Sequence, residues 1–477
     1  MTAAHYDLVV IGSGPAGQKG AVAAAKRGRR VAIVDRRAMA GGSSLHRGTI
    51  PSKTLREAII YLTGIRQRSF YGVDYRERDH IDMRDLTARV RPVLERETAV
   101  VRAQLERNGI ALIDGLARFI DPCRLEVETE NGTKQLSAEH ILIACGTRPA
   151  NSPGVPIDGR RVFDSDQILQ LERIPRELVI VGAGVIGLEY ASMMAALGIR
   201  VTLVEQRKTV LDFVDQEILG ALMYHLRSMG VTFRLGEEVV AVECSDSTPV
   251  TTRLASGKVI RSDALLHAVG RRGNADSLSI EAAGLVTDSR GRIAVNECFQ
   301  TAVSHIYAAG DVVGFPALAA TSMEQGRLAC EHFMGGASRF SPELMPYGIY
   351  TIPEISMVGR TEEELTAAAI PYEIGVSRFR ELAKGQMVGD EIGMLKLLFD
   401  PVSLRLLGVH VIGESAAEIA HVGQAVLSLG GTMEYFRDTV FNYPTFAEAY
   451  KVAALNGLNR VGSGFGVPER SVKLAAD

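Results

Sequence analysis

The chain of 477 residues contains no tryptophan and only five cysteines. The cysteines are scattered, include no C-x-x-C pair, and are odd in number, so at least one is left unpaired. A disulfide framework of the kind that staples small secreted proteins is therefore excluded, and we expect reduced thiols in the cytoplasm. The cysteines are Cys123, Cys145, Cys244, Cys298 and Cys330.

An excess of charge is also absent, since 53 basic and 56 acidic residues give a formal net charge of −3. This balance gives no reason to expect nucleic acid as a partner. No apolar run approaches the ~20 residues that span a bilayer, and no basic, apolar leader precedes the expected first strand near Tyr6. We therefore expect a cytoplasmic protein with no membrane partner, and the ten histidines form no pattern that indicates a metal site.

Glycine, in contrast, is abundant at 48 residues. Gly12, Gly14 and Gly17 form G-x-G-x-x-G between an apolar run and an alanine-rich expected helix, and the next apolar strand ends at Asp35. In such a β-α-β unit the first glycine permits the tight turn, the second lets the backbone approach a pyrophosphate, and the third permits close helix–strand packing. The helix N-terminus offers N–H groups to the phosphates, and Asp35 can accept a hydrogen bond from a ribose hydroxyl.

A second complete fingerprint follows in the same chain. Gly182, Gly184 and Gly187 lie between another apolar strand and a helix, and the next strand ends at Glu205. An acid in this place favours a free ribose 2′-hydroxyl, hence NAD, whereas an arginine nearby accommodates the 2′-phosphate of NADP. Arg207 stands two residues further on, so the combination fits a site that both nucleotides visit. Arg207 as an ordinary solvated charge remains an equal alternative.

Residues 41–53 read GGSSLHRGTIPSK and follow the first fingerprint. This segment resembles one found in two-domain flavoproteins, G-G-x-C-x-x-x-x-C-x-P-S-K, in which two cysteines form a redox disulfide against the flavin, but here Ser44 and Thr49 occupy both cysteine places. Neither hydroxyl can form a disulfide, and the thiolate is the nucleophile of dithiol chemistry. No other cysteine lies in the first 122 residues, so none replaces them.

These motifs, in this order, resemble the flavoprotein disulfide reductases, such as dihydrolipoyl dehydrogenase and glutathione reductase, over nearly the whole chain. Within them the chain is most similar to the soluble pyridine nucleotide transhydrogenases, in residues 48–58, where Thr49 stands at the second cysteine place, and in residues 441–445. The fold class predicted is α/β, with two Rossmann-like dinucleotide-binding domains and a C-terminal α+β dimerisation domain. The resemblance implies FAD in the first domain, NAD(P) in the second, and a homodimer whose C-terminal domain completes the partner's active site.

The expected domain boundaries follow from the motifs. They are 1–155 for the first part of the FAD-binding domain, 156–270 for the NAD(P)-binding domain, 271–344 for the second part of the FAD-binding domain, 345–465 for the dimerisation domain and 466–477 for a mobile tail. Residues 264–271 are expected to form one strand that returns to the first domain.

The resemblance also implies the roles of individual residues. Lys53 would lie beside the flavin and pair with Glu189, while Thr49 would lie against the flavin face as packing or as a hydrogen-bond donor. The expected FAD-binding residues are Gly12, Gly14, Gly17, Asp35, Gly42, Ser43, Lys53, Gly115, Thr147, Asp311 and Ala319. The expected NAD(P)-binding residues are Gly182, Gly184, Gly187, Glu205, Arg207 and Gly270.

The base of the reductases is a histidine before the proline of H-P-T-x-x-E, and here Tyr443 occupies that place, with Glu448 at the place of the acid. A phenol has a reference pKa of about 10 against about 6.5 for imidazole, which makes it a poor proton acceptor near pH 7. Hydride exchange between nicotinamide and flavin needs neither a dithiol nor this base. The sequence therefore predicts FAD-dependent hydride transfer between NADPH and NAD⁺. The alternatives are an NAD(P)H-dependent reductase of a quinone or other small acceptor, and a non-catalytic docking subunit.

Overall fold

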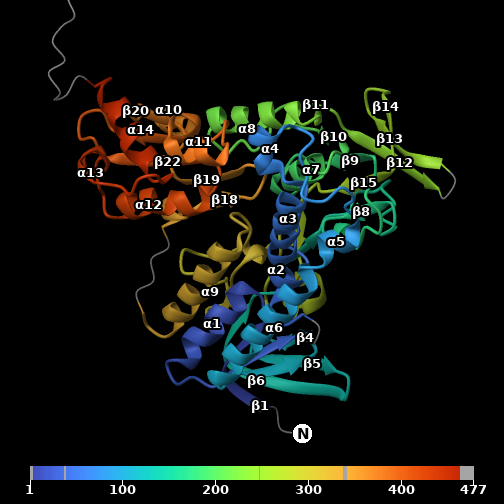
Figure 1. Ribbon diagram of the computed structural model, residues 1–477. Coiled ribbons are helices and arrows are strands. Elements are labelled where there is room, and N and C mark those ends of the chain that lie inside the picture. Colours follow the sequence, from blue (N-terminus) through green and yellow to red (C-terminus); the bar gives the residue numbers. More distant parts are fainter. Residues whose placement is uncertain (1–3, 37–38, 246–247, 337–340, 462–477) are drawn as a thin grey trace, which may run out of the picture. The chain divides into compact units, whose positions relative to one another are not determined.

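The computed structural model describes residues 4–36, 39–245, 248–336 and 341–461 (Figure 1). The predicted tail at 466–477 lies outside these residues. The chain divides into two compact units. Unit 1 comprises 1–65, 75–210 and 226–341, and unit 2 comprises 66–74, 211–225 and 342–477.

The first sheet of unit 1 has the order β3-β2-β1-β6-β5-β4, with β17 paired to β6. Strands β3, β2, β1, β6 and β17 run parallel, whereas β5 pairs antiparallel with both β6 and β4. Both faces of β1 are buried, because Val9 and Ile11 belong to one apolar core and Leu8 and Val10 to the other. This explains the unbroken apolar run in the sequence. The strands are β1 (Ala4–Ile11), β2 (Val31–Asp35), β3 (Ala111–Asp114), β4 (Leu116–Asp121), β5 (Arg124–Thr129), β6 (Gly132–Ile143) and β17 (Ile306–Ala308).

Helices α1 (Pro15–Ala25) and α9 (Ala319–Phe333) lie side by side on this sheet (Figure 1). Their contact depends on glycine, since a Cβ at Gly326 would overlap the backbone of Ala16. The sequence-distant residues 319–333 thereby reach the first glycine turn. The other helices of unit 1 before the second sheet are α2 (Gly42–His46), α3 (Thr49–Thr63), α5 (Met83–Thr87) and α6 (Val90–Arg107).

The second sheet of unit 1 is entirely parallel, in the order β11-β10-β9-β15-β8. Helix α7 (Val185–Ala196) connects β9 to β10, which repeats the β1-α1-β2 arrangement of the first sheet. An antiparallel sheet of β12, β13 and β14 precedes β15 in the chain. The strands are β8 (Val162–Asp164), β9 (Glu177–Val181), β10 (Arg200–Glu205), β11 (Thr232–Leu235), β12 (Val239–Ser245), β13 (Thr248–Leu254), β14 (Val259–Ser262) and β15 (Ala264–His267).

The single strand expected over residues 264–271 is wrong. Strand β15 ends at His267, and Gly270 adopts φ 121°, a backbone conformation that turns the chain. The chain then forms β16 (Arg271–Gly273), which pairs antiparallel with β7 (Thr147–Pro149). This turn brings the residues that follow the second sheet against the end of the first.

Unit 2 contains an antiparallel sheet in the order β18-β19-β22-β21-β20. Helix α12 packs on β19 and β22, and helix α14 packs on β20 and β21. The elements are β18 (Tyr347–Ile349), β19 (Glu354–Gly359), β20 (Glu373–Arg378), β21 (Met394–Phe399), β22 (Leu406–Gly413), α4 (Arg68–Tyr71), α10 (Glu362–Ala367), α11 (Ala383–Val388), α12 (Ala416–Ser428), α13 (Met433–Asp438) and α14 (Glu448–Leu458), with α8 (Gln216–Ser228) beginning in this unit.

Unit 2 also buries a charged cluster. The Lys396 side chain on β21 is 0% exposed, and its Nζ lies 3.0 Å from Asp215 Oδ2, 3.2 Å from Glu217 Oε2 and in contact with Glu362 Oε1. Burial alone would lower the pKa of Lys396, but Glu362 and Asp215 outweigh it and raise the pKa, so the amine is charged at neutral pH. The cluster ties the residues before α8 to the sheet of unit 2.

Candidate functional site

The two glycine turns of unit 1 have nearly the same backbone. Gly12 has φ 103° and Gly182 has φ 104°. A Cβ at Gly12 would overlap the carbonyl oxygen of Ala144, and one at Gly182 would overlap that of Ala268. Both positions therefore require glycine for two reasons, the positive φ of the backbone and the close approach of the residue after the neighbouring strand.

The third glycine of each turn also has no room for a side chain. A Cβ at Gly17 would overlap the carbonyl oxygen of Gly12, and a Cβ at Gly187 would overlap that of Gly182. At each of the two turns this contact packs the helix closely against the turn that precedes it, as expected from the sequence.

The middle glycines, Gly14 and Gly184, differ from the other two because the space that a Cβ would occupy is empty. A Cβ at Gly184 would meet no described atom within 4 Å outside its chain neighbours, and one at Gly14 would meet only the Cα of Gly42, at 4.0 Å. Gly14 and Gly184 cap α1 and α7, and neither cap contributes a side-chain hydrogen bond. A helix N-terminus beside a glycine without a side chain fits the pyrophosphate of a dinucleotide. The residues present therefore fit one dinucleotide at each turn.

Each acid at the end of the second strand accepts a hydrogen bond from its own turn. Asp35 Oδ2 accepts from the backbone N–H of Ser13 at 2.7 Å, and Glu205 Oε2 accepts from that of Ala183 at 2.8 Å. Burial alone would raise the pKa of Glu205, but hydrogen bonds from Arg207 and Ala183 outweigh it and lower the pKa. Glu205 is therefore ionised at neutral pH.

The remaining partners of the two acids distinguish the turns. The Ser13 hydroxyl donates to Asp35 Oδ2 at 2.6 Å, and it also accepts from the N–H of Gly41 at 3.1 Å. The second turn has alanine at the equivalent place, and Glu205 Oε1 instead accepts from the side chain of Arg207 at 3.1 Å. The Arg207 side chain is 50% exposed, so this ion pair lies at the protein surface.

The segment 41–53 folds onto the first turn. Gly42 has φ 68°, and a Cβ at this residue would lie 2.6 Å from the Cα of Gly14. The carbonyl of Ser43 accepts hydrogen bonds from the N–H groups of Arg47 and Gly48, at 2.9 and 2.7 Å, which ends α2. Thr49 then begins α3.

Helix α3 brings Lys53 to the second glycine motif. Lys53 Nζ donates to Glu189 Oε2 at 2.6 Å, and the two side chains are 25% and 6% exposed. Because Glu189 lies on α7, this contact joins the segment after the first fingerprint to the helix of the second. The structure thus brings together two residues that were predicted as a pair from motifs 136 positions apart.

The other predicted FAD residues cluster at the carboxyl edge of the first sheet. The N–H of Gly115 donates to the carbonyl of Asp35 at 3.0 Å. The Thr147 hydroxyl donates to Asp311 Oδ2 at 3.2 Å, and Ala319 is the first residue of α9. The predicted NAD(P) residue Gly270 lies in the turn between β15 and β16, directly before Arg271.

Three further residues form contacts in this region, and the sequence analysis did not predict them as site residues. Ser13 is the variable position of the first G-x-G, Arg271 follows Gly270, and Asp166 lies in the loop after β8. Arg271 Nε donates to the Thr147 hydroxyl at 2.9 Å, and its Nη1 donates to Asp166 Oδ1 at 2.7 Å. The adjacency of Arg271 to a predicted residue was an available signal, whereas Asp166 offered none.

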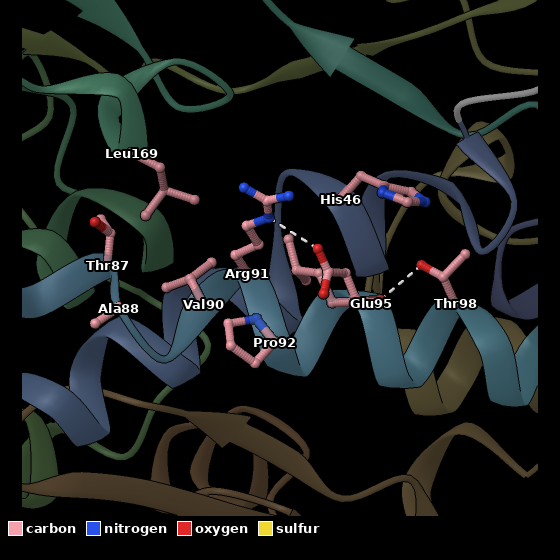
Figure 2. Close-up of a pocket in the computed structure, with 10 residues that line it drawn as sticks. His46, Thr87, Ala88, Val90, Arg91, Pro92, Glu95, Thr98 and Leu169 are labelled. Carbon is pink, nitrogen blue, oxygen red and sulfur yellow. Dashed lines mark hydrogen bonds and ion pairs between the residues drawn. The ribbon is translucent and has the colours of Figure 1, made fainter. Parts of the chain in front are cut away.

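An open groove of about 790 Å³ runs along α6, beside α2 (Figure 2). His46, Arg91, Glu95 and Leu169 contribute to its lining, and Arg91 pairs with Glu95 one turn along the helix. None of the predicted site residues is among the described residues that line it.

The C-terminal candidates lie in unit 2. The Tyr443 side chain is 75% exposed, and Glu448 Oε2 accepts from the N–H of Thr445 at 3.3 Å. Within the described part of the chain, no group of three or more His, Cys, Asp or Glu residues could hold a metal ion, and no helix is long and apolar enough to cross a membrane. The five cysteines are free thiols.

Comparison with known proteins agrees with this architecture. Residues 6–326 match the pyridine nucleotide-disulphide oxidoreductase family, and residues 345–454 match the dimerisation domain of the same family. The structure of LpdA from Mycobacterium tuberculosis matches with a TM-score of 0.88 and 25% identity, over 95% of this chain and 99% of that one. The flavoprotein disulfide reductase RclA from Escherichia coli matches with a TM-score of 0.84 and 28% identity, over 94% and 99%. The predicted fold class is confirmed.

Two relatives narrow the identification. The chain is 56% identical to a soluble pyridine nucleotide transhydrogenase of Mycobacterium bovis (strain BCG Pasteur). This match spans 459 residues, which are 96% of this chain and 98% of that protein. It is 46% identical over 469 residues to the soluble pyridine nucleotide transhydrogenase of Serratia proteamaculans, covering 96% and 99%. The chain therefore belongs to the pyridine nucleotide-disulphide oxidoreductase family and, within it, to the soluble pyridine nucleotide transhydrogenases.

Proposed function

We propose that this protein transfers hydride between NADPH and NAD⁺, using FAD as its cofactor and no redox disulfide. The observation that carries the proposal is the combination of two complete dinucleotide turns with hydroxyl residues, Ser44 and Thr49, at both positions of the redox cysteines. FAD, when bound, supplies the chemistry that accepts hydride from one nicotinamide and returns it to another.

The chain's own residues would bind and orient the reactants. The turn at Gly12, Gly14 and Gly17 would hold the FAD pyrophosphate, and Asp35 a ribose hydroxyl. Gly42, Ser43, Gly115, Thr147, Asp311 and Ala319 would complete the FAD site. The Lys53 ammonium would lie near the reacting ring, where a cation stabilises the negative charge that reduction brings. Glu189 would hold Lys53 in place through the 2.6 Å contact, and Thr49 would pack against the ring or donate a hydrogen bond to it.

The second turn, with Gly182, Gly184, Gly187 and Gly270, would bind both nicotinamide nucleotides. The Glu205–Arg207 ion pair supports this dual use, because the two side chains suit different nucleotides. Glu205 can accept from the 2′-hydroxyl of NADH, while Arg207 can leave Glu205 and donate to the 2′-phosphate of NADPH.

The proposal includes the assembly and the location of the enzyme. The match of residues 345–454 to a dimerisation domain supports a homodimer, in which we expect the C-terminal domain to complete the partner's active site. We also propose that the first part of the FAD-binding domain ends at residue 155, the NAD(P)-binding domain at 270, the second part of the FAD-binding domain at 344 and the dimerisation domain at 465. The name of the relatives describes soluble enzymes, and we propose the cytoplasm as the location.

The test is an anaerobic assay of the purified protein with NADPH and a spectrally distinct NAD⁺ analogue, run beside lipoamide and a quinone at matched concentrations. Rapid reduction of the analogue without turnover of lipoamide is the expected result. If NADPH bleaches the flavin and only the quinone reoxidises it, the acceptor in the proposal is wrong. If NADPH does not bleach the flavin at all, the proposed reaction is wrong as a whole.

A further inference from the structure

Arg271 connects residues from three separate parts of unit 1. Its Nη2 donates to the carbonyl of Thr147 at 2.9 Å and its Nε donates to the Thr147 hydroxyl at 2.9 Å. On its other side, Nη1 donates to Asp166 Oδ1 at 2.7 Å and to the Ser165 hydroxyl at 3.3 Å. The planar guanidinium is thus fixed on both edges, which a single ammonium could not achieve.

The contact with Thr147 has a direction. A hydroxyl has one proton, and the Thr147 oxygen receives a hydrogen bond from Arg271, so its own proton is free to point to Asp311 Oδ2 at 3.2 Å. Arg271 therefore orients the Thr147 hydroxyl toward the Asp311 carboxylate. Asp311 follows Gly310 at the start of a short 3-10 turn, beside α9.

Asp166 also contacts the segment 41–53, which has Ser44 and Thr49 at the two cysteine places. Asp166 Oδ2 lies 3.5 Å from Arg47 Nη1, and the Asp166 side chain is only 9% exposed. The charges alternate along the contacts from Arg47 through Asp166 to Arg271, and the Thr147 hydroxyl links Arg271 to Asp311. A partly buried carboxylate between two guanidinium groups is well compensated, so Asp166 can hold both of them.

We propose that Arg271 and Asp166 are positioning residues for the flavin site, which they hold by fixing the Thr147 hydroxyl and through it the Asp311 carboxylate. This inference rests on the proposed function, since it assumes FAD at the first turn. Arg271 directly follows Gly270 of the second nucleotide site, so the same residue ties the strand that leaves that site to two residues of the FAD site.

The test uses the FAD-loaded enzyme and the variants Arg271→Lys, Asp166→Asn and Thr147→Val. Arg272→Lys is the matched control, because Arg272 is the next residue of the same strand and is exposed. Arg271→Lys keeps the charge and loses the two-edged contact, and Thr147→Val removes only the hydroxyl. This last variant keeps the experiment decisive if an Arg271 variant does not fold.

Two readouts separate positioning from a general loss of stability. We expect FAD to dissociate roughly tenfold faster from Arg271→Lys and Thr147→Val than from Arg272→Lys, as loss of a charge-assisted hydrogen bond predicts. We also expect the midpoint potential of the flavin to fall, because the Asp311 carboxylate then loses the hydrogen bond that the oriented Thr147 hydroxyl donates to it. A lower melting temperature with unchanged FAD release and potential would overturn the inference.

The outcome is independent of the transhydrogenase reaction. If the wild-type enzyme does not pass hydride from NADPH to the NAD⁺ analogue, but Arg271→Lys still releases FAD faster, the proposed function fails and the positioning role stands. If transhydrogenation proceeds and the Arg271→Lys and Arg272→Lys enzymes are indistinguishable in both readouts, the positioning role fails and the function stands.

Discussion

Replacing Lys396 by methionine removes the only cation that the structure places among Asp215, Glu217 and Glu362 in the described part of unit 2. The side chains of Lys396 and Asp215 are 0% and 1% exposed, so water does not compensate either charge. Breaking a buried ion pair by removing one partner costs about 3–5 kcal/mol. We expect Lys396→Met to reduce the free energy of unfolding of unit 2 by this amount.

Asp215→Asn should cost less, about 1–3 kcal/mol, because Lys396 retains Glu362 and Glu217 as partners. The double variant should cost less than the sum of the two single variants, since it leaves no uncompensated charge on Asp215. Asp215 Oδ1 also accepts from the N–H groups of Glu217 and Ile218 at 3.1 and 3.3 Å, and asparagine can keep these contacts.

The assay is urea unfolding followed by far-ultraviolet circular dichroism, because the chain has no tryptophan whose emission could be recorded. Lys396→Arg serves as the control that keeps the charge in a larger side chain. A cost below about 1 kcal/mol for Lys396→Met, or strict additivity in the double variant, would refute the reasoning from burial.

Three further predictions concern the nucleotide site and the effect of pH. Arg207→Ala should raise KM for NADPH about tenfold and leave KM for NADH nearly unchanged, and an equal effect on both in steady-state kinetics would contradict the phosphate role. Gly184→Ala should fold normally but bind NADPH roughly tenfold more weakly in equilibrium titration, whereas Gly187→Ala, which overlaps the Gly182 carbonyl, should lose about 1–3 kcal/mol in urea unfolding. Burial lowers the pKa of His410. Below pH ~6.5 the unfolded chain therefore binds a proton that the folded protein does not, and the free energy of unfolding falls by up to about 1.4 kcal/mol per pH unit as the pH decreases. In unfolding measured from pH 7 to 5, His410→Gln should flatten this loss.

The local features of this fold could be predicted from the sequence. Each glycine turn is specified within about 25 residues, because the strand, the turn, the helix and the acid are contiguous. The backbone contacts of Gly17 and Gly187 lie inside that stretch, whereas Gly12 and Gly182 also approach the carbonyls of the distant Ala144 and Ala268. Lys53 and Glu189 were predicted as a pair only through the family resemblance, since no local rule connects them.

The rest depends on contacts between distant residues. The Arg271–Thr147 contact spans 124 positions and the Arg271–Asp166 contact spans 105, so neither leaves a periodic signal. Lys396 is a cation within the apolar strand β21, and the strand itself does not indicate its partner. Its partner Asp215 lies 181 positions earlier, where composition alone gives no reason to choose it.

The difference between Ser13 and Ala183 has a consequence for time scales. At the first turn, the Ser13 hydroxyl ties the acid to the following segment through Gly41, so opening that turn requires several hydrogen bonds to break together. At the second turn, the acid is held by the backbone N–H groups of Ala183 and Arg207 and by the side chain of Arg207, which lies at the surface and can exchange partners. We expect the first turn to hold its nucleotide for longer than the second, as a prosthetic group is held for longer than a substrate.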